Sequence, residues 1–339
     1  MVEEFNSYVG LSNIGNTCYM NSAIQCLIHI PELRNFFLTG SHLTCLNKNS
    51  IEYNLTKQWE KLTYLLCQSK EDKIINPINL IQEFLKVNHH KNINFNGFAQ
   101  NDIEDFLNIL LEHIHNSISK RITINITGTI VNVQDQLAYD AAKSWEKFFN
   151  SSYSHIINTL YSQLLSTTIC PSCKYTCMNY EPIMSISLSI PPDILNNTSI
   201  TIEDLLDHYT KEEILDTDNQ WKCDKCKINV NCHKKLTFWN LSPVIIFVIK
   251  KYNIRNKLNF NFEYPQNLDM NKYCINYNEK SLKYKLIACG IHSGGLNGGH
   301  YYAICKKYSD WYMYNDTSVS KIDEKKIKNN DAYCLVYRR

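Results

Sequence analysis

The chain has 339 residues and 44% of them are apolar, so it can bury the core of one large domain or of two ordinary ones. Its 35 Lys and Arg residues nearly balance its 33 Asp and Glu residues, and a formal charge of +2 excludes a general attraction to nucleic acid or to an anionic membrane. The strongest apolar run, Val244–Ile249, is too short to span a bilayer.

The expected location follows from the N-terminal segment and the cysteines. MVEEFNSYVG lacks the basic and apolar regions of a secretion signal. The 14 cysteines, two pairs of which are C-x-x-C, suit a reducing compartment better than a disulfide scaffold. We therefore expect a soluble, cytoplasmic monomer, and a nuclear location also fits. The abundance of Asn, Ile, Lys and Tyr is typical of an AT-rich genome, such as that of a virus or a protist.

The first informative stretch is GLSNIGNTCYMNSAIQC, which begins at Gly10. Apolar residues recur at helical spacing after Cys18, and Asn16 or Thr17 can cap the free N–H groups before them, so a helix is expected to begin at or next to Cys18. The partial positive charge of that helix end would lower the pKa of the thiol and favour a nucleophilic thiolate. The alternative is one buried, structural thiol among many.

The residues of this stretch, read on to Leu27, resemble the cysteine box of the ubiquitin-specific proteases almost residue for residue. The resemblance implies that Cys18 is the nucleophile. It also implies that Asn13 donates a hydrogen bond to the oxyanion.

Helical patterns cover residues 50–91, and an amphipathic helix is expected from Asn101. Asp102 and Asp105 share one face of its first turn, where acids commonly do no more than offset the helix dipole. The segment QNDIEDFL, however, resembles the second motif of the same family. The match implies that Gln100 flanks the catalytic centre and that the two acids face arginines in the C-terminal tail of ubiquitin. Asp105 is a departure, because the family more often has Glu there.

Two C-x-x-C pairs follow, and together they form the donor set of a tetrahedral structural zinc site. Their members are Cys170, Cys173, Cys223 and Cys226. The separation of the pairs is long for a compact zinc ribbon, so we expect a sheet to join them. The alternative is a set of reduced cysteines without metal, and Cys177, Cys232 and His233 are spare ligands nearby. The resemblance makes this region the zinc-bearing fingers that hold the globular body of ubiquitin.

A buried strand is expected at Val244–Tyr252. Its end, Lys250-Lys251-Tyr252, resembles a Lys-Arg-Phe run in the family, with the Arg and the Phe both replaced. The replacements keep the charge and the aromatic ring.

The last segment is predicted to form two strands, 286–292 and 300–305, joined by a glycine-rich loop. A further strand is expected to begin at Trp311. In an antiparallel arrangement His300 then lies close to Asn315 and Asp316. A lone histidine is more often structural, but with an activated cysteine this is the Cys/His/Asn set of papain-like chemistry.

The family motif at Trp311 implies that Asn315 orients His300. We expect its amide oxygen to accept from Nδ1–H of the imidazole, and we expect Asp316 to act as support. Gly298 and Gly299 should leave room for a substrate tail that ends in Gly-Gly, and Tyr301 should line that passage.

The resemblance covers about residues 10–337 and implies an α+β, papain-like cysteine peptidase fold. We expect one catalytic domain at 8–339, with a thumb at about 10–150, zinc-bearing fingers at about 157–240 and a palm mainly at 241–339. The implied activity is thiol-dependent hydrolysis after the C-terminal glycine of ubiquitin in conjugates, with one structural Zn²⁺.

Three alternative functions make different, testable predictions. A non-catalytic zinc-ribbon module that binds ubiquitin would need a basic face and no Cys/His/Asn set. An inactive ubiquitin binder would be expected to have lost Cys18 or His300. A protease for a ubiquitin-like modifier fits the same motifs, because the choice between modifiers rests on contacts across the fingers.

Overall fold

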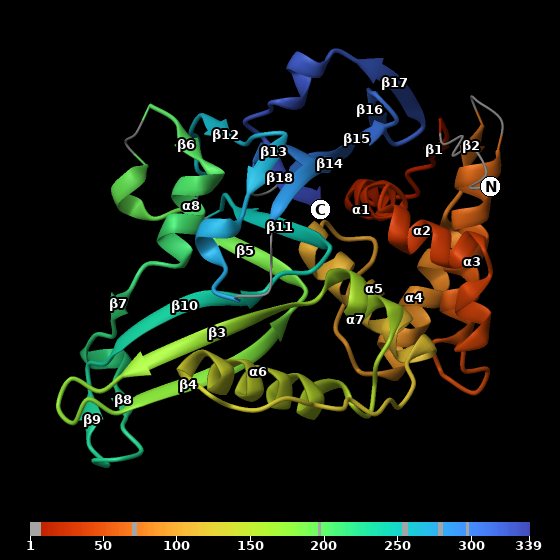
Figure 1. The fold of residues 1–339 in the computed structure, drawn as a ribbon. Coiled ribbons are helices and arrows are strands. Elements are labelled where there is room, and N and C mark those ends of the chain that lie inside the picture. The colour runs from red at the N-terminus through yellow and green to blue at the C-terminus, as the bar shows by residue number, and fades with distance from the viewer. Residues whose placement is uncertain (1–7, 70–72, 196–197, 253–256, 277–280, 296–297) are drawn as a thin grey trace.

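The computed structural model describes residues 8–69, 73–195, 198–252, 257–276, 281–295 and 298–339. Most of the helices gather on one side of the molecule, and most of the strands lie on the other together with helices α6 (Val133–Phe149) and α8 (Ile202–Tyr209) (Figure 1). We call the helical part of the molecule the thumb. Its helices are α1 (Cys18–Ile28), α2 (Pro31–Leu38), α3 (Tyr53–Gln68), α4 (Ile78–His90), α5 (Ile103–Ile118) and α7 (His155–Leu160). A short parallel pair, β1 (Gly10–Leu11) with β2 (Ile74–Ile75), lies beside them. No helix in the described ranges is long and apolar enough to cross a membrane.

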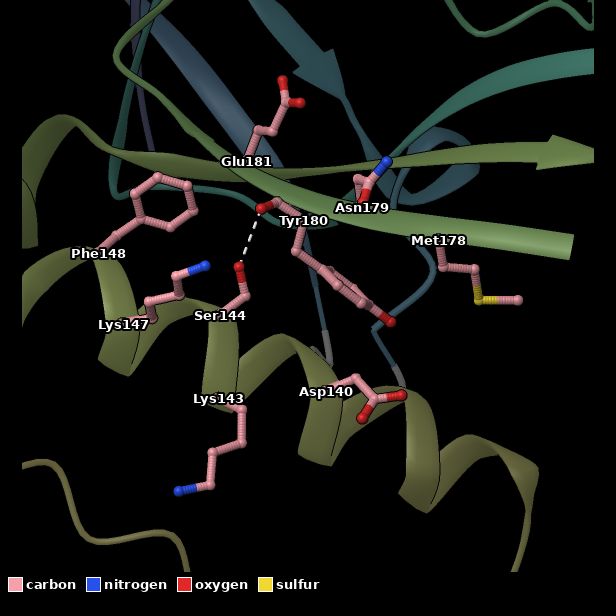
Figure 2. A pocket seen from close by; sticks show the side chains of 9 residues that line it. All are labelled: Asp140, Lys143, Ser144, Lys147, Phe148, Met178, Asn179, Tyr180 and Glu181. Atoms are coloured by element: carbon pink, nitrogen blue, oxygen red, sulfur yellow. Dashed lines mark hydrogen bonds between the residues drawn. The ribbon is translucent and has the colours of Figure 1, made fainter. Parts of the chain in front are cut away.

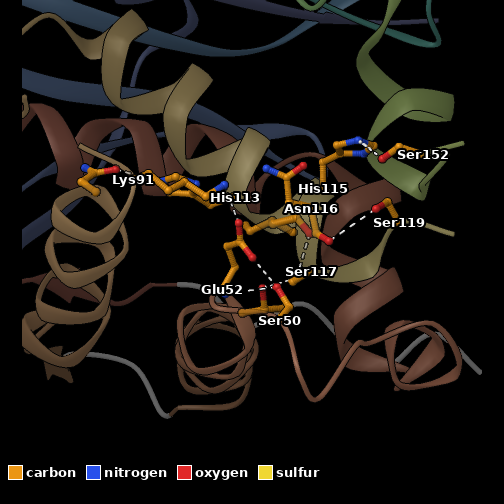
Figure 3. Close-up of polar contacts among 12 residues, drawn as sticks. Ser50, Glu52, Lys91, His113, His115, Asn116, Ser117, Ser119 and Ser152 are labelled. Carbon is orange, nitrogen blue, oxygen red and sulfur yellow. Dashed lines mark hydrogen bonds and ion pairs between the residues drawn. The ribbon is translucent and has the colours of Figure 1, made fainter. Parts of the chain in front are cut away.

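A polar cluster joins three thumb helices (Figure 3). Glu52, at the start of α3, is buried and forms an ion pair with Lys91 at the end of α4, with 2.5 Å between Oε1 and Nζ. His113 of α5 contacts Asn88 Oδ1 through Nε2 at 2.7 Å. Burial, and then the charge of Lys91, lower the pKa of His113 to about 4, so its ring is neutral at physiological pH. The cluster therefore fixes the helices to one another without a buried unpaired charge.

The second part of the molecule, the palm, is an eight-stranded sheet with a buried apolar core on each of its two faces. Its order is β17-β16-β15-β14-β18-β11-β5, and β13 pairs with β14 beside this path. The strands are β5 (Ser185–Ser189), β11 (Val244–Lys250), β13 (Asn267–Asp269), β14 (Lys283–Gly295), β15 (Gly298–Lys307), β16 (Asp310–Asn315), β17 (Ser318–Ile322) and β18 (Ala332–Arg338).

Successive side chains of β11 point to opposite faces of the palm sheet, and both faces are buried. Val244, Ile246 and Val248 pack toward the thumb core, whereas Ile245 and Phe247 pack into a second core on the other face. That second core is covered by α8 (Ile202–Tyr209) and by the pair β6 (Ile200–Thr201) with β12 (Phe262–Glu263). Helices α1 and α5 cover the thumb face.

The third part, the fingers, is a four-stranded sheet of order β4-β3-β10-β7. Its strands are β3 (Ser162–Ile169), β4 (Thr176–Ile183), β7 (Glu213–Ile214) and β10 (His233–Asn240), and the hairpin β8 (Trp221–Lys222) with β9 (Asn229–Val230) lies at its far end. Helix α6 (Val133–Phe149) packs on β4, where Ser144 Oγ donates to the carbonyl of Tyr180 at 2.9 Å. A shallow groove of about 470 Å³ lies between them (Figure 2).

Several boundaries differ from the sequence expectation. The glycine-rich segment expected as a loop forms the ends of β14 and β15, with only Leu296 and Asn297 outside the described residues. β5 lies within the range expected as fingers but pairs with β11, so it belongs to the palm sheet. Period-2 alternation in a polar segment cannot reveal which of two sheets a strand joins.

Candidate active site

Helix α1 begins at Cys18, as the apolar periodicity predicts, but its cap is not the expected one. Thr17 occupies the cap position without a side-chain hydrogen bond to the helix, because its Oγ1 accepts from Ile14 N at 3.1 Å. Asn16 has a left-handed φ of +53° and donates to the carbonyl of Phe98 at 3.1 Å. Both candidate caps instead shape the loop before the helix, so the first N–H groups of α1 remain for other partners.

The sulfur of Cys18 uses some of these groups. It is 6% exposed, and the main-chain groups of Tyr301 in β15, of Tyr19 and of Cys18 itself act to lower the pKa of its thiol. Burial nevertheless raises the pKa of the thiol, and the charge of Asp316 adds to that effect. The expected lowering by the helix end is therefore wrong as a net direction. The thiol needs a base to take its proton.

The structure brings His300 and Asn315 together. They lie on the neighbouring strands β15 and β16, and the His300 Nε2 atom is 2.6 Å from Asn315 Oδ1. The expectation that Nδ1 makes this contact is wrong, because the ring presents Nε2 to the amide. Nδ1 is then the nitrogen that can accept the proton of Cys18. The main chain of Tyr301, the next residue along β15, acts on the Cys18 thiol, so the sulfur lies near the strand that carries His300.

Asp316 does not continue the strand. β16 ends at Asn315, and Asp316 has a left-handed φ of +48°, which short acidic and amide side chains tolerate better than most. Its Oδ2 accepts from Asn13 Nδ2 at 3.0 Å, and its Oδ1 accepts from Asn21 Nδ2 at 2.8 Å. Thus Asp316 supports the amide expected to bind the oxyanion, and the histidine contact is made by Asn315.

Asn21 is a site residue that our sequence reasoning missed. It lies one turn after Cys18 and is 3% exposed. All eleven residues of this helix are buried, and a buried amide needs hydrogen-bond partners. The signal in the sequence is the position of Asn21 within the cysteine box, one helical turn after Cys18. Asn13 is held on its other side as well, since its Oδ1 accepts from Gly15 N at 3.1 Å and from Thr17 N at 3.2 Å.

We expect Asn315→Ala to lower kcat/KM by about 10- to 100-fold, because an unanchored imidazole samples orientations that cannot take the proton of Cys18. The measurement is hydrolysis of a ubiquitin-fluorophore amide at equal folded fraction. Asn315→Asp is the matched variant, because it keeps an acceptor at the same place and should retain more activity than alanine. Equal losses in both variants would contradict an orienting role for the acceptor.

A groove of about 390 Å³ lies between the start of α5 and the palm, next to Tyr301. It is lined by Gln100, Asn101, Asp102, Lys250, Tyr252, His292, Gly295, Tyr301 and Tyr333. Of the residues expected to contact substrate, Gln100, Asp102 and Tyr301 line this groove. Gly298 and Gly299, the first residues of β15, are not among the residues that line the groove, whereas Gly295 is.

The two expected tail-binding acids differ. Asp102 caps α5 through its Oδ1, and its Oδ2 accepts from Tyr333 Oη at 2.5 Å and from Lys250 Nζ at 3.2 Å. Asp105 is exposed, and partial burial followed by the charge of Asp102 raises its pKa. Asp105 is thus the acid with more room for a basic side chain, whereas Lys250 partly neutralises Asp102. Lys250 also pairs with Glu104, and the sequence did not identify either residue as part of the site.

The four cysteines of the C-x-x-C pairs converge at the far end of the fingers. Each pair forms the same turn: Lys174 N donates to Cys170 O at 3.0 Å, and Lys227 N donates to Cys223 O at 2.8 Å. Both lysines have left-handed φ angles, +58° and +62°. The two halves of the site are therefore built alike.

The spacing of the sulfurs fits a zinc ion. All four Sγ atoms lie within 4.8 Å of one another, with 3.8 Å between Cys170 and Cys226 and 3.6 Å between Cys173 and Cys223. Tetrahedral thiolates at a Zn–S distance of about 2.3 Å are separated by about 3.8 Å. Among the described residues the spare candidates Cys177, Cys232 and His233 are not members of this group.

Comparisons with known proteins agree with one another. A family model described as ubiquitin carboxyl-terminal hydrolase matches residues 9–337. Ubiquitin carboxyl-terminal hydrolase 2 of Bos taurus is 30% identical over 338 residues, which cover 97% of this chain and 54% of that protein. Ubiquitin carboxyl-terminal hydrolase 21 of Rattus norvegicus is 26% identical, with 98% of this chain and 62% of that protein covered. The chain thus spans about half the length of the first of these relatives.

Solved structures resemble the chain in fold. The SAGA Ubp8/Sgf11/Sus1/Sgf73 DUB module bound to ubiquitin aldehyde contains a chain with a TM-score of 0.74 and 24% identity, over 100% of this chain and 71% of that one. The same module with a substituted Ubp8, bound to monoubiquitin, gives 0.74 and 23%, over 100% of this chain and 70% of that one. The α+β, papain-like fold with thumb, palm and fingers is therefore confirmed.

Proposed function

The chain belongs to the ubiquitin carboxyl-terminal hydrolase family, and from this premise we propose that it is a cysteine-type deubiquitinase. The proposed reaction is hydrolysis of the bond after the C-terminal glycine of ubiquitin in conjugates. The observation that carries the proposal is the convergence of a helix-start thiol, a histidine held by an amide, and a second amide held by a carboxylate.

The proposed mechanism uses these groups in turn. The proton of Cys18 passes to Nδ1 of His300, and the thiolate attacks the carbonyl carbon of the terminal glycine. The Asn13 amide, which keeps one N–H beyond that given to Asp316, and a main-chain N–H stabilise the oxyanion. The leaving amine takes the proton from His300 as the C–N bond breaks, which leaves a thioester. His300 then accepts a proton from water, the hydroxide attacks the thioester, and the proton returns to the departing sulfur.

The test uses covalent probes built on ubiquitin and on its relatives, each ending in a group that reacts with cysteine. A deubiquitinase should be labelled by the ubiquitin probe at Cys18, as located by peptide mass spectrometry. Faster labelling by a probe built on a ubiquitin-like modifier would identify that modifier as the substrate, and the same mechanism would then apply to it. An absence of labelling by every probe, in protein whose Cys18 reacts with iodoacetamide, would count against the whole proposal.

We also propose that the chain binds one structural zinc ion through Cys170, Cys173, Cys223 and Cys226. The four-sulfur geometry supports this assignment, and the ion would tie the β3–β4 turn to the β8–β9 turn. Because the cluster lies at the end of the fingers, far along the sheet from α1, the metal would act on folding and on substrate binding (Figure 1).

For the zinc site we expect about one zinc per chain in protein purified without added metal, and about none in Cys223→Ser. The variant should melt at a lower temperature and show a raised KM with a smaller change in kcat. Metal analysis by mass spectrometry and a melting curve measure these effects. Cys177→Ser, which removes a half-buried sulfur outside the group, is the matched control and should keep its zinc. Metal-free wild type of unchanged stability would contradict the assignment.

A further inference from the structure

Tyr252, which stands in place of the Phe in the Lys-Arg-Phe run of the family, lies just after β11 and lines the groove beside Tyr301. Its ring packs edge-on against His292 at 5.4 Å between centroids, and its hydroxyl is hydrogen-bonded to His292 Nδ1. The His292 ring in turn lies 4.3 Å from the ring of Tyr301. A phenylalanine at position 252 could keep the ring contact but not the hydrogen bond.

The other edge of the His292 ring lies against Gly299. A Cβ atom built on Gly299 would lie 2.3 Å from His292 Nε2 and 2.6 Å from Cε1, so the imidazole fills the space that a side chain would need. The main chain of His292 is also held, since its N donates to Asp331 O at 3.0 Å and its O accepts from Lys257 Nζ at 2.8 Å. Gly299 immediately precedes His300.

We propose that Tyr252 is a positioning residue that acts through His292: its hydroxyl holds the imidazole against Gly299 and so fixes the strand end that presents His300 to Cys18. This inference rests on the proposed function, because it concerns the base of that reaction. It assigns a role to a hydroxyl group that touches neither the thiol nor the amides.

The protonation states suit this arrangement. Burial, then the charges of Asp331 and Asp102, raise the pKa of Tyr252 to about 12. Burial and the neighbouring Lys257 lower the pKa of His292 to about 4. Near neutral pH a phenol and a neutral imidazole therefore meet, and the phenol is the better donor. Nδ1 accepts, and the single ring proton of His292 is on Nε2.

The first experiment is imidazole ¹⁵N NMR on the full chain, which reads the tautomer directly. Wild type should show His292 with its proton on Nε2, and Tyr252→Phe should show a mixture of tautomers or the other one. The proton on Nδ1 in wild type would overturn the proposal. This result does not depend on any substrate.

The second experiment measures catalysis. Tyr252→Phe should lower kcat on a ubiquitin-fluorophore amide by about 3- to 30-fold, the range expected when one orienting hydrogen bond is lost, and should change KM less than about twofold. In a His292→Phe background the same substitution should have almost no further effect. Additive losses, or an unchanged kcat, would refute action through His292.

A third measurement separates this proposal from the proposed function. Alkylation of Cys18 by iodoacetamide needs no ubiquitin, and its rate should fall in Tyr252→Phe by about the same factor as kcat, because a displaced His300 takes the thiol proton less often. Tyr302→Phe is the matched control: it removes a hydroxyl from the opposite face of β15, where it accepts from Asn329 Nδ2 at 3.0 Å, and should leave both rates unchanged. An unaltered alkylation rate in Tyr252→Phe would contradict the proposal even if ubiquitin proved not to be the substrate.

Discussion

Cys18→Ala is expected to lower hydrolysis of a ubiquitin-fluorophore amide by at least about 10⁴-fold while leaving ubiquitin binding largely intact. The reason is spatial: the chemistry depends on one sulfur at the start of α1, whereas the proposed contact surface extends over the groove, the palm and the fingers. Turnover is measured at saturating substrate, and binding is measured by calorimetry with free ubiquitin.

Cys45→Ala is the matched control for Cys18→Ala. Cys45 is a half-buried thiol of the thumb, outside the groove, so its loss should leave turnover within about twofold of wild type. If Cys18→Ala kept a hundredth of wild-type turnover, another group would have to be the nucleophile. If it lost ubiquitin binding as well, the sulfur would be part of the binding surface.

Asn13→Ala is expected to lower kcat by about 10²- to 10³-fold, the usual effect of losing one oxyanion donor, with little change in KM. The structure adds a second expectation. Because the Asp316 carboxylate holds both Asn13 and Asn21, Asp316→Ala should lower kcat largely through Asn13. Its effect should therefore shrink when Asn13 is already alanine.

The double-mutant cycle of Asn13 and Asp316 tests this dependence at equal folded fraction. Asp316→Asn is the matched variant, because its amide keeps one acceptor oxygen and should retain more activity than alanine. Fully additive losses would show that Asp316 acts on another group, with His300 the first to examine. A change confined to KM would instead remove Asn13 from the oxyanion site.

Much of the site follows from local patterns. The apolar periodicity after Cys18 predicts a helix that begins there, and the structure has it at Cys18–Ile28. Strand alternation predicts a hairpin that brings His300 to the level of Asn315, and the two are 2.6 Å apart. The spacing of the C-x-x-C pairs predicts a four-sulfur cluster, and the sulfurs converge. Each of these predictions depends on neighbours along one element or on a short turn.

The remainder depends on contacts that no local pattern encodes. The net direction of the shift in the pKa of Cys18 is set by how deeply the folded chain buries the thiol, which helix-dipole reasoning omits. Which ring nitrogen of His300 contacts Asn315 depends on the rotation of the His300 side chain. The role of Asp316 depends on its left-handed backbone angle at the end of a strand. Lys250 appears in the site only because β11 ends beside α5.

The distance along the chain between the two halves of the site has a consequence for biosynthesis. Asn13 and Asp316 are 303 positions apart, and at a translation rate of about 5–20 residues per second the ribosome needs about 15–60 s to pass from one to the other. During that time the site cannot assemble, because Asn315 and Asp316 have not been made and Cys18 lacks an oriented base to take its proton. Helix α1, whose eleven residues are all buried in the finished protein, meanwhile lacks β15 as a packing partner. It is therefore the segment that we expect a chaperone at the ribosome exit to shield.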